Sequence, residues 1–241
     1  MRYLVNLSYN GSKFYGYQIQ KNNITVEGEL ESILSKIFNE KINTIGSSRT
    51  DRKVHALDQY CHFDSDKLID TEKLTYSINS MINEDIYIKS IKIDNNIHAR
   101  YSTIRKEYIY KINMGEYNPI EREYVFQYNK IINESLIKDF ISKMNGEHNF
   151  KSFTSDKNNG NYIRNVNISY NIEDNKLYLK FSSSGFLRYM IRNIVGLLLD
   201  INDGKKNIKD IDYIFNCEDR CKLGRCASPC GLYLNYIELS K

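Results

Sequence analysis

Two kinds of short segment alternate along this chain. In one kind every second residue is apolar, and in the other the apolar residues recur at helical spacing. Residues 2–9 are of the first kind, with one apolar face made of Tyr3, Val5, Leu7 and Tyr9. Residues 25–38 are of the second kind, and Thr25 is a suitable N-cap. Strands and helices interspersed without a regular βαβ repeat favour an α+β fold.

The pattern restarts near residue 98, which predicts two related halves, residues 1–97 and 98–241. In the first half we expect further strands at 59–64 and 86–93 and a helix at 71–82. In the second half we expect a strand at 107–113, a helix at 133–144 capped by Asn133 with Gly146 beyond its end, a hairpin of 163–172 and 176–184, helices at 186–201 and 207–215, and a closing strand at 231–239.

Composition describes an ordinary globular chain. Of its 241 residues, 41% are hydrophobic and 27% are charged. We find no apolar run of membrane-spanning length and no N-terminal signal pattern, so we expect a cytoplasmic protein without a membrane partner. The net charge of +4 permits an anionic partner without demanding one.

Four cysteines are clustered late in the chain, in CEDRCKLGRCASPC, at Cys217, Cys221, Cys226 and Cys230. The gaps of three, four and three residues do not match the paired knuckles of common zinc sites. A zinc-binding scaffold is therefore a remote alternative, and disulfides are rare in the cytosol. We interpret these residues as reduced, ordinary cysteines and expect neither metal nor cofactor.

The strongest candidate for a catalytic carboxylate is Asp51, which lies between Arg49 and Arg52. Neighbouring guanidinium groups favour the ionised form, which suits a nucleophile or a base rather than a general acid. The alternative is a solvated loop with surface ion pairs. His55 and His62 follow closely, and we expect both to be packed or hydrogen-bonded rather than catalytic.

Further candidates lie in the second half. Arg188 and Arg192 are four residues apart in an apolar helical pattern, so we expect both on one side of the helix, paired with a carboxylate or a phosphate, or with their heads in water. Tyr108 follows Arg105 and Lys106 at the start of a strand. Basic residues interleaved with aromatic ones are typical of proteins that bind single-stranded or splayed-out RNA, although a tyrosine on a strand is usually core.

Several segments together resemble one family, the tRNA pseudouridine synthase A (TruA) family. They are YNGSKFYGYQIQ, TVEGELE, SSRTDRKVHALDQYCHF, HARYS with KEYIY, GEHNF, GFLRYMIRNIVGLLL and GLYL. They follow the family's order from residue 3 to about residue 236. The resemblance implies a pseudouridine synthase fold, with two ferredoxin-like-related halves joined into one mainly antiparallel sheet flanked by helices. The first half carries the catalytic loop and the second completes the active-site cleft.

The resemblance also implies an activity. The family isomerises uridine in RNA to pseudouridine, breaking the C1′–N1 bond and joining C1′ to C5, without metal or cofactor. By position, Asp51 matches the catalytic Asp, Arg49 the Arg associated with base extrusion, and Tyr108 the Tyr that stacks on the base. Arg192 matches the Arg that pairs with the carboxylate, and Leu232 an apolar residue of the pocket. A homodimer and a tRNA anticodon stem-loop target, at positions 38 to 40, are implied as well.

The motif departs from the family at two positions. Arg52 and Lys53 replace a usual Ala-Gly pair, which matters if the turn needs a positive φ. The extra charge beside Asp51 could contact a phosphate. Alternatives are therefore a related enzyme for another tRNA site or ribosomal RNA, or a non-catalytic RNA-binding protein. Whether Asp51 attacks C1′ or removes the 2′ proton stays open.

Overall fold

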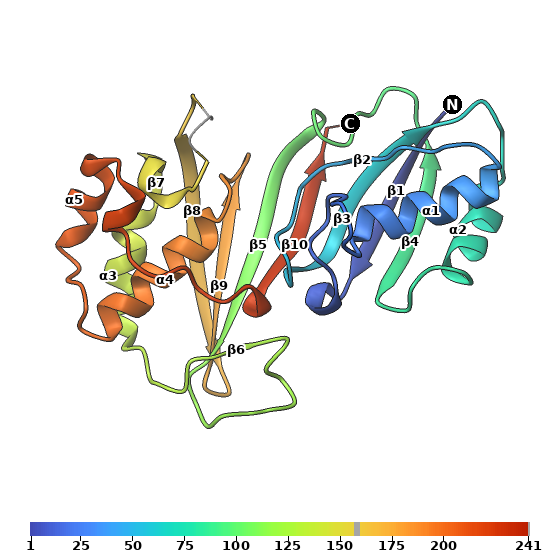
Figure 1. The fold of residues 1–241 in the computed structure, drawn as a ribbon. Helices are drawn as coiled ribbons and strands as arrows, with labels where there is room; N and C mark the ends of the chain where they lie inside the picture. The colour runs from blue at the N-terminus through green and yellow to red at the C-terminus, as the bar shows by residue number, and fades with distance from the viewer. Residues whose placement is uncertain (157–159, 241) are drawn as a thin grey trace. The chain divides into compact units, whose positions relative to one another are not determined.

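The computed structural model describes residues 1–156 and 160–240. The chain forms two compact units: unit 1 contains residues 1–106 and 233–241, and unit 2 contains residues 107–232. Both combine strands with helices (Figure 1), which confirms the α+β class. Two strands, β5 (Thr103–Asn113) and β10 (Leu232–Leu239), have residues in both units.

Unit 1 is a helix-covered sheet with strand order β4-β1-β3-β10. Its elements are β1 (Arg2–Tyr9), α1 (Val26–Phe38), β2 (Ile45–Gly46), β3 (His55–Asp64), α2 (Thr71–Asn79) and β4 (Ile86–Ile93). The central strand β1 pairs antiparallel with both β3 and β4, and β10 pairs parallel with β3. The predicted inner face of β1 is buried throughout. Leu4 and Asn6 on its other face are buried too.

An aromatic cluster forms the core of unit 1 between β1, α1 and β3. The rings of Tyr3 and Phe63 stack with centroids 4.9 Å apart, and Phe38 meets both edge-on. All three side chains are at most 1% exposed. Burying aromatic side chains of this size is the main contribution that such residues make to folding.

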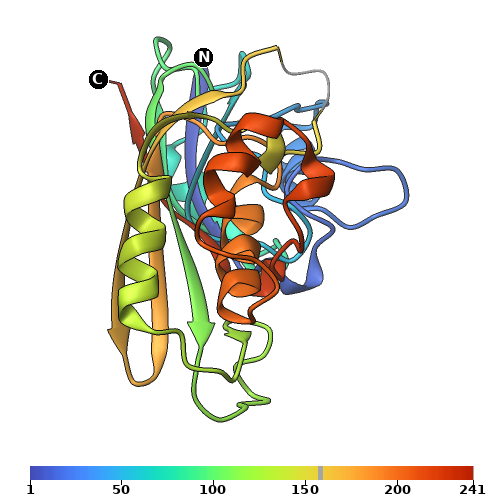
Figure 2. The ribbon, with the colours of Figure 1, turned by 90° about the vertical axis from the view of Figure 1, so that its left-hand side faces the viewer.

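Unit 2 has the strand order β5-β9-β8-β7, with three helices beside the β8–β9 hairpin (Figure 2). Its further elements are β6 (Phe126–Gln127), α3 (Glu134–Met144), β7 (Gly146–Asn149), β8 (Ile163–Glu173), β9 (Lys176–Ser183), α4 (Met190–Asn202) and α5 (Asp210–Cys217). The predicted hairpin is confirmed: β8 and β9 pair antiparallel, and both turn residues, Asp174 and Asn175, have positive φ.

Three residues predicted to lie at helix ends are found there. The Thr25 hydroxyl accepts a hydrogen bond from Gly28 N at 3.3 Å, and the Asn133 side chain accepts one from Ser135 N at 2.8 Å. Gly146, just beyond α3, has a φ of +104°. Local side-chain caps therefore set where α1 and α3 begin.

The predicted start of the fourth helix, at residue 186, is wrong. Helix α4 begins at Met190, because Tyr189 has a left-handed backbone with a φ of +62°. Arg188 consequently precedes the helix, and the expectation that Arg188 and Arg192 share one helix face fails. Both guanidinium groups instead lie over the ring of Tyr189, at 4.9 and 5.4 Å from its centroid.

Within the described ranges 1–156 and 160–240, the helices are too short or too polar for any of them to cross a lipid bilayer.

His62 is buried and neutral in the folded protein. Its Nδ1 accepts a hydrogen bond from Ala99 N at 3.1 Å, and its ring meets His98 edge-on. Its Nε2 has no hydrogen-bond partner among the described residues. Burial, together with the positive charge of Arg2, lowers the pKa of His62 to about 4.

We therefore expect the protein to lose stability as the pH falls from about 6.5 to about 4. In this window the unfolded chain binds a proton at His62 that the folded chain does not bind, so acid favours unfolding. Urea unfolding at a series of pH values measures the effect. His62→Asn keeps an acceptor near Nδ1 and should flatten the dependence; an unchanged slope would contradict this assignment.

Candidate active site

The loop that carries Asp51 connects β2 to β3 in unit 1. Its main chain is fixed on both sides: Ser47 N donates to Tyr60 O at 2.8 Å, and Tyr17 N donates to Thr50 O at 3.1 Å. Thr50 is buried, and its hydroxyl lies 2.8 Å from the hydroxyl of Tyr9 on β1. A half-buried Asp51 is thus held by its neighbours on a rigid frame.

The Asp51 loop packs closely against residues 11–17, because two of those residues are glycines. Gly16 has a φ of +96°, and a side chain there would come within 2.8 Å of Thr50 O. A side chain at Gly11 would come within 2.0 Å of Val54 O. The glycines of the sequence segment NGSKFYGYQ therefore allow two stretches of main chain to pack in direct contact.

The two arginines that flank Asp51 in sequence each contact a side chain of the same unit. Arg49 Nη1 donates to Gln18 Oε1 at 3.0 Å, and Arg52 lies over the ring of Tyr15 at 4.1 Å from its centroid. Both arginines are exposed. Their charges therefore stand at the surface beside Asp51, where a phosphate could reach them.

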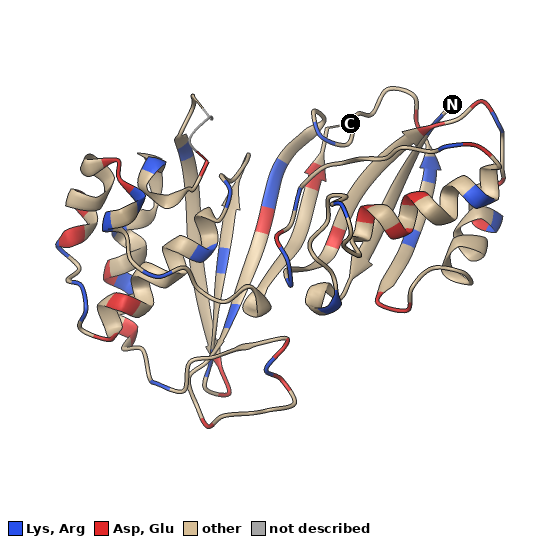
Figure 3. Cartoon of the chain, in the orientation of Figure 1, with Lys and Arg blue, Asp and Glu red and all other residues tan. Residues whose placement is uncertain are grey.

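A half-buried lysine adds to this basic surface. Lys106 Nζ donates to Ser47 O at 2.7 Å, at the start of the Asp51 loop. Burial, together with the charges of Arg100 and Arg49, lowers the pKa of Lys106 to about 8. Basic residues near the start of β5 are visible in Figure 3. An anion among these three cations would favour the charged form of Lys106.

The two histidines near Asp51 are packed, as the sequence predicts. His55 is 2% exposed, accepts a hydrogen bond from Gly11 N at 3.2 Å, and stacks on Tyr233 with centroids 4.6 Å apart. His62 lies in the core, as described above. Each is thus accounted for by packing and hydrogen bonding.

In unit 2, Tyr108 lies on β5 with 6% of its surface exposed. Its ring meets Phe186 edge-on, with centroids 5.3 Å apart. The sequence did not identify Phe186 as a partner of Tyr108, because residue 186 was predicted to belong to the helix 186–201. The left-handed Tyr189 separates it from α4.

Arg192 lies in the first turn of α4, and its Nε donates to Ala227 O at 2.8 Å. Leu232 is 6% exposed and follows Gly231, where a side chain would come within 2.5 Å of Lys111 O. The glycine of the GLYL motif thus allows this segment to lie directly against β5. Within unit 2, main-chain packing fixes the places of both Arg192 and Leu232.

The late cysteines make ordinary contacts. Cys217 Sγ donates to Ile214 O at 3.4 Å and lies 3.8 Å from the Ser152 hydroxyl. Cys230 Sγ lies 3.1 Å from the hydroxyl of Ser228. Across residues 1–156 and 160–240, no group of three or more His, Cys, Asp or Glu side chains is arranged to hold a metal ion.

Comparison with known proteins shows the family to which the chain belongs. The profile of a family described as tRNA pseudouridine synthase matches residues 7–102 and 140–238. The tRNA pseudouridine synthase A of Malacoplasma penetrans is 39% identical over 239 residues, covering 97% of this chain and 98% of its own length. The same enzyme of Latilactobacillus sakei is 33% identical, covering 98% of each chain.

The chain belongs to the tRNA pseudouridine synthase A family. As a member of that family it is a tRNA pseudouridine synthase, an isomerase. Among solved structures, a chain of a Cbf5–Nop10–Gar1 complex is similar with a TM-score of 0.43 and 12% identity, covering 98% of this chain and 48% of that one. At that score the likeness adds nothing to the assignment.

The turn after Asp51 contains Lys53, where the resembling family usually has glycine. Val54 N donates to Asp51 O at 3.1 Å, and Lys53, at the third position of this turn, has a φ of +66°. That backbone conformation favours glycine and strains a lysine. The family's usual glycine therefore fits the turn, and this chain tolerates a strained residue there.

Lys53→Gly should stabilise the protein by about 1 kcal/mol, because it removes the left-handed strain at a small cost in chain entropy. For a chain of this size the melting temperature should rise by roughly 2–4 °C. Lys53→Ala is the matched control, since it removes the charge and keeps the Cβ atom. A gain in the Ala variant equal to that in the Gly variant would show that strain is not the cause.

Proposed function

We propose that the enzyme converts uridines at positions 38 to 40 of the tRNA anticodon stem-loop to pseudouridine, with Asp51 as the nucleophile or base. The observation that carries the proposal is the Asp51 loop itself. It has the family's Arg-Thr-Asp sequence, and its main chain is held rigidly by Tyr17 and Tyr60. A fixed carboxylate is what chemistry at C1′ or at the 2′ position of the sugar requires.

The remaining residues take roles that their surroundings support. Tyr108 stacks on the extruded base, and its ring is already buttressed by Phe186. By resemblance to the family, Arg192 takes the place of the arginine that pairs with the catalytic carboxylate, and Leu232 that of an apolar residue of the pocket. Taking a base out of its stack costs a few kcal/mol. Arg49 and neighbouring cations offset part of that cost by binding phosphates.

We further propose that the enzyme works in the cytoplasm as a homodimer, as the family resemblance implies. Size-exclusion chromatography with light scattering gives the mass in solution. Two copies of the 28.4 kDa chain are expected.

Asp51→Asn should reduce product formation by about 10²–10⁴-fold or more, while tRNA affinity stays within a few-fold of the wild type. The amide keeps the size of the side chain but can neither attack nor accept a proton. Carbodiimide mapping of a tRNA transcript measures product at each uridine, and filter binding measures affinity. Asp66→Asn, an exposed residue of the same unit, is the matched control.

Each outcome separates the alternatives. Product formed by Asp51→Asn at the wild-type rate would make the catalytic assignment wrong. Wild-type product at uridines other than 38 to 40, or in ribosomal RNA only, would support an enzyme for a different target. Tight tRNA binding without product in the wild-type protein would support a non-catalytic RNA-binding protein.

Tyr108→Phe should keep most activity, whereas Tyr108→Leu should lose roughly 5- to 150-fold, since stacking of one base on an aromatic ring contributes about 1–3 kcal/mol. Initial rates on tRNA at subsaturating concentration measure this loss. Thermal melting of both variants controls for the contact with Phe186. Equal activity in the two variants would argue against a stacking role.

A further inference from the structure

A segment of unit 2 runs along one face of α4. We name residues 219–228 the strap. It contacts α4 at positions four residues apart, namely Arg192, Gly196 and Asp200, which share one helix face. The strap lies within the cysteine-rich stretch whose function the sequence left unassigned.

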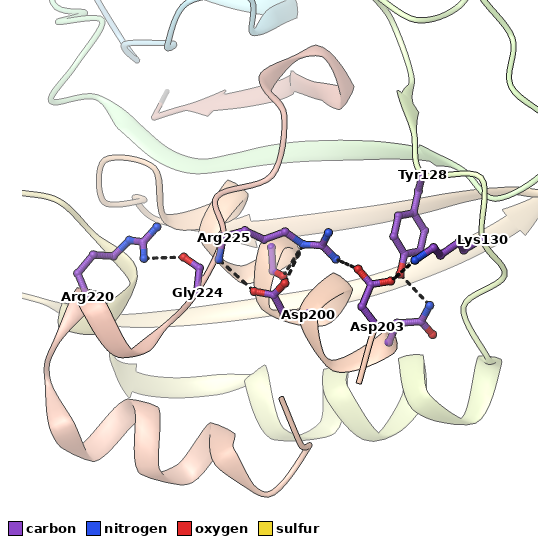
Figure 4. A network of polar contacts seen from close by, with 9 residues as sticks. Tyr128, Lys130, Asp200, Asp203, Arg220, Gly224 and Arg225 are labelled. Atoms are coloured by element: carbon purple, nitrogen blue, oxygen red, sulfur yellow. Dashed lines mark hydrogen bonds and ion pairs between the residues drawn. The ribbon is translucent and has the colours of Figure 1, made fainter. Parts of the chain in front are cut away.

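Arg225 anchors the strap to α4 (Figure 4). Its main-chain N donates to Asp200 Oδ2 at 3.0 Å, and its Nε lies 3.1 Å from Asp200 Oδ1. Its Nη2 lies 2.9 Å from Asp203 Oδ2. Asp200 is only 5% exposed, so water competes poorly for the contacts between its carboxylate and Arg225.

Asp203 is itself held by a second layer of contacts. Lys130 Nζ donates to its Oδ1 at 2.7 Å, and the Tyr128 hydroxyl donates to the same atom at 2.9 Å. The hydrogen bond from Lys130 is the largest cause of a lowered pKa at Asp203. With the hydrogen bond from Tyr128 and the charge of Arg225, it brings that pKa to about 2. Asp203 therefore stays ionised opposite Arg225 at neutral pH.

Two glycines bring the strap into direct contact with the helix. A side chain at Gly196 would come within 2.0 Å of Arg225 O. A side chain at Gly224, where φ is +107°, would come within 2.4 Å of Asp200 Oδ2. At Gly196 the two main chains are in direct contact, and at Gly224 the main chain lies against the Asp200 carboxylate, so the strap has little freedom to slide along α4.

Ala227 of the strap holds Arg192. Ala227 N donates to Arg192 O at 2.9 Å, and Arg192 Nε donates back to Ala227 O at 2.8 Å. Ala227 is only two residues beyond Arg225. The carbonyl that orients the Arg192 guanidinium is therefore placed by the anchor at Asp200.

We propose that Asp200 and Arg225 are positioning residues for catalysis, which set the orientation of the Arg192 guanidinium through the strap. The inference rests on the proposed role of Arg192 in catalysis. A misplacement of about 1 Å in such a group can cost as much as 10²-fold in rate. The anchor thus controls turnover without touching the RNA.

The test is a double-mutant cycle on kcat and KM for tRNA. Arg225→Gln should lower kcat by about 10-fold with KM changed less than about twofold, because orientation rather than binding is lost. In an Arg192→Lys background the same substitution should lower kcat by less than about twofold, because the group that it positions is already gone. Arg225→Lys, which can still pair with Asp200, should fall between Gln and wild type.

Lys143→Gln is the matched control. It breaks an ion pair with Asp212 in the same unit and should leave kcat unchanged. Asp203→Asn keeps the Asp200 contacts of Arg225, so it provides a milder variant if Arg225→Gln melts below the assay temperature. That variant should lower kcat by less than Arg225→Gln and lose its effect in the Arg192→Lys background.

Equal losses of kcat in the wild-type and Arg192→Lys backgrounds would overturn the inference, as would a rise in KM with kcat unchanged. If Arg192→Lys alone leaves kcat unchanged, the proposed role of Arg192 is wrong. The proposed activity of Asp51 is tested separately and does not depend on this cycle.

Discussion

Everything proposed for Asp51 depends on the hydrogen bonds that hold the main chain on either side of it. Thr50 is fixed through both its hydroxyl, to Tyr9, and its carbonyl, to Tyr17. Gly16 permits that contact because it has no side chain to collide with Thr50 O. A catalytic carboxylate on a loop needs such a frame, since loops otherwise lack the precision that chemistry demands.

Local patterns predicted much of the secondary structure because their causes are local. The caps Thr25 and Asn133 act on residues two or three positions away, and the hairpin turn at Asp174 and Asn175 uses residues that tolerate positive φ. The failure at α4 has the opposite origin. Tyr189 adopts a conformation that its own chemistry disfavours, and only the surrounding structure can impose it.

The candidate site likewise contains features that the sequence could predict and features that it could not. The Arg-Thr-Asp motif could be found by its sequence, and so could the packed state of His55 and His62. The strap could not, because the partners of Arg225 lie 22 and 25 residues away and no short-range pattern links them. The conspicuous signal in that stretch was its cysteines, whereas the contacts that fix it come from an arginine and two glycines.

The direct packing of the strap on α4 has a thermodynamic consequence. A long, flexible side chain such as arginine loses rotamer freedom when it is ordered, up to about 2 kcal/mol. For Arg192 that loss occurs when the chain folds, since Ala227 holds its Nε in the protein without RNA. In the role proposed for Arg192, tRNA would meet a guanidinium that is already oriented, and less of the free energy of association would be consumed in arranging it.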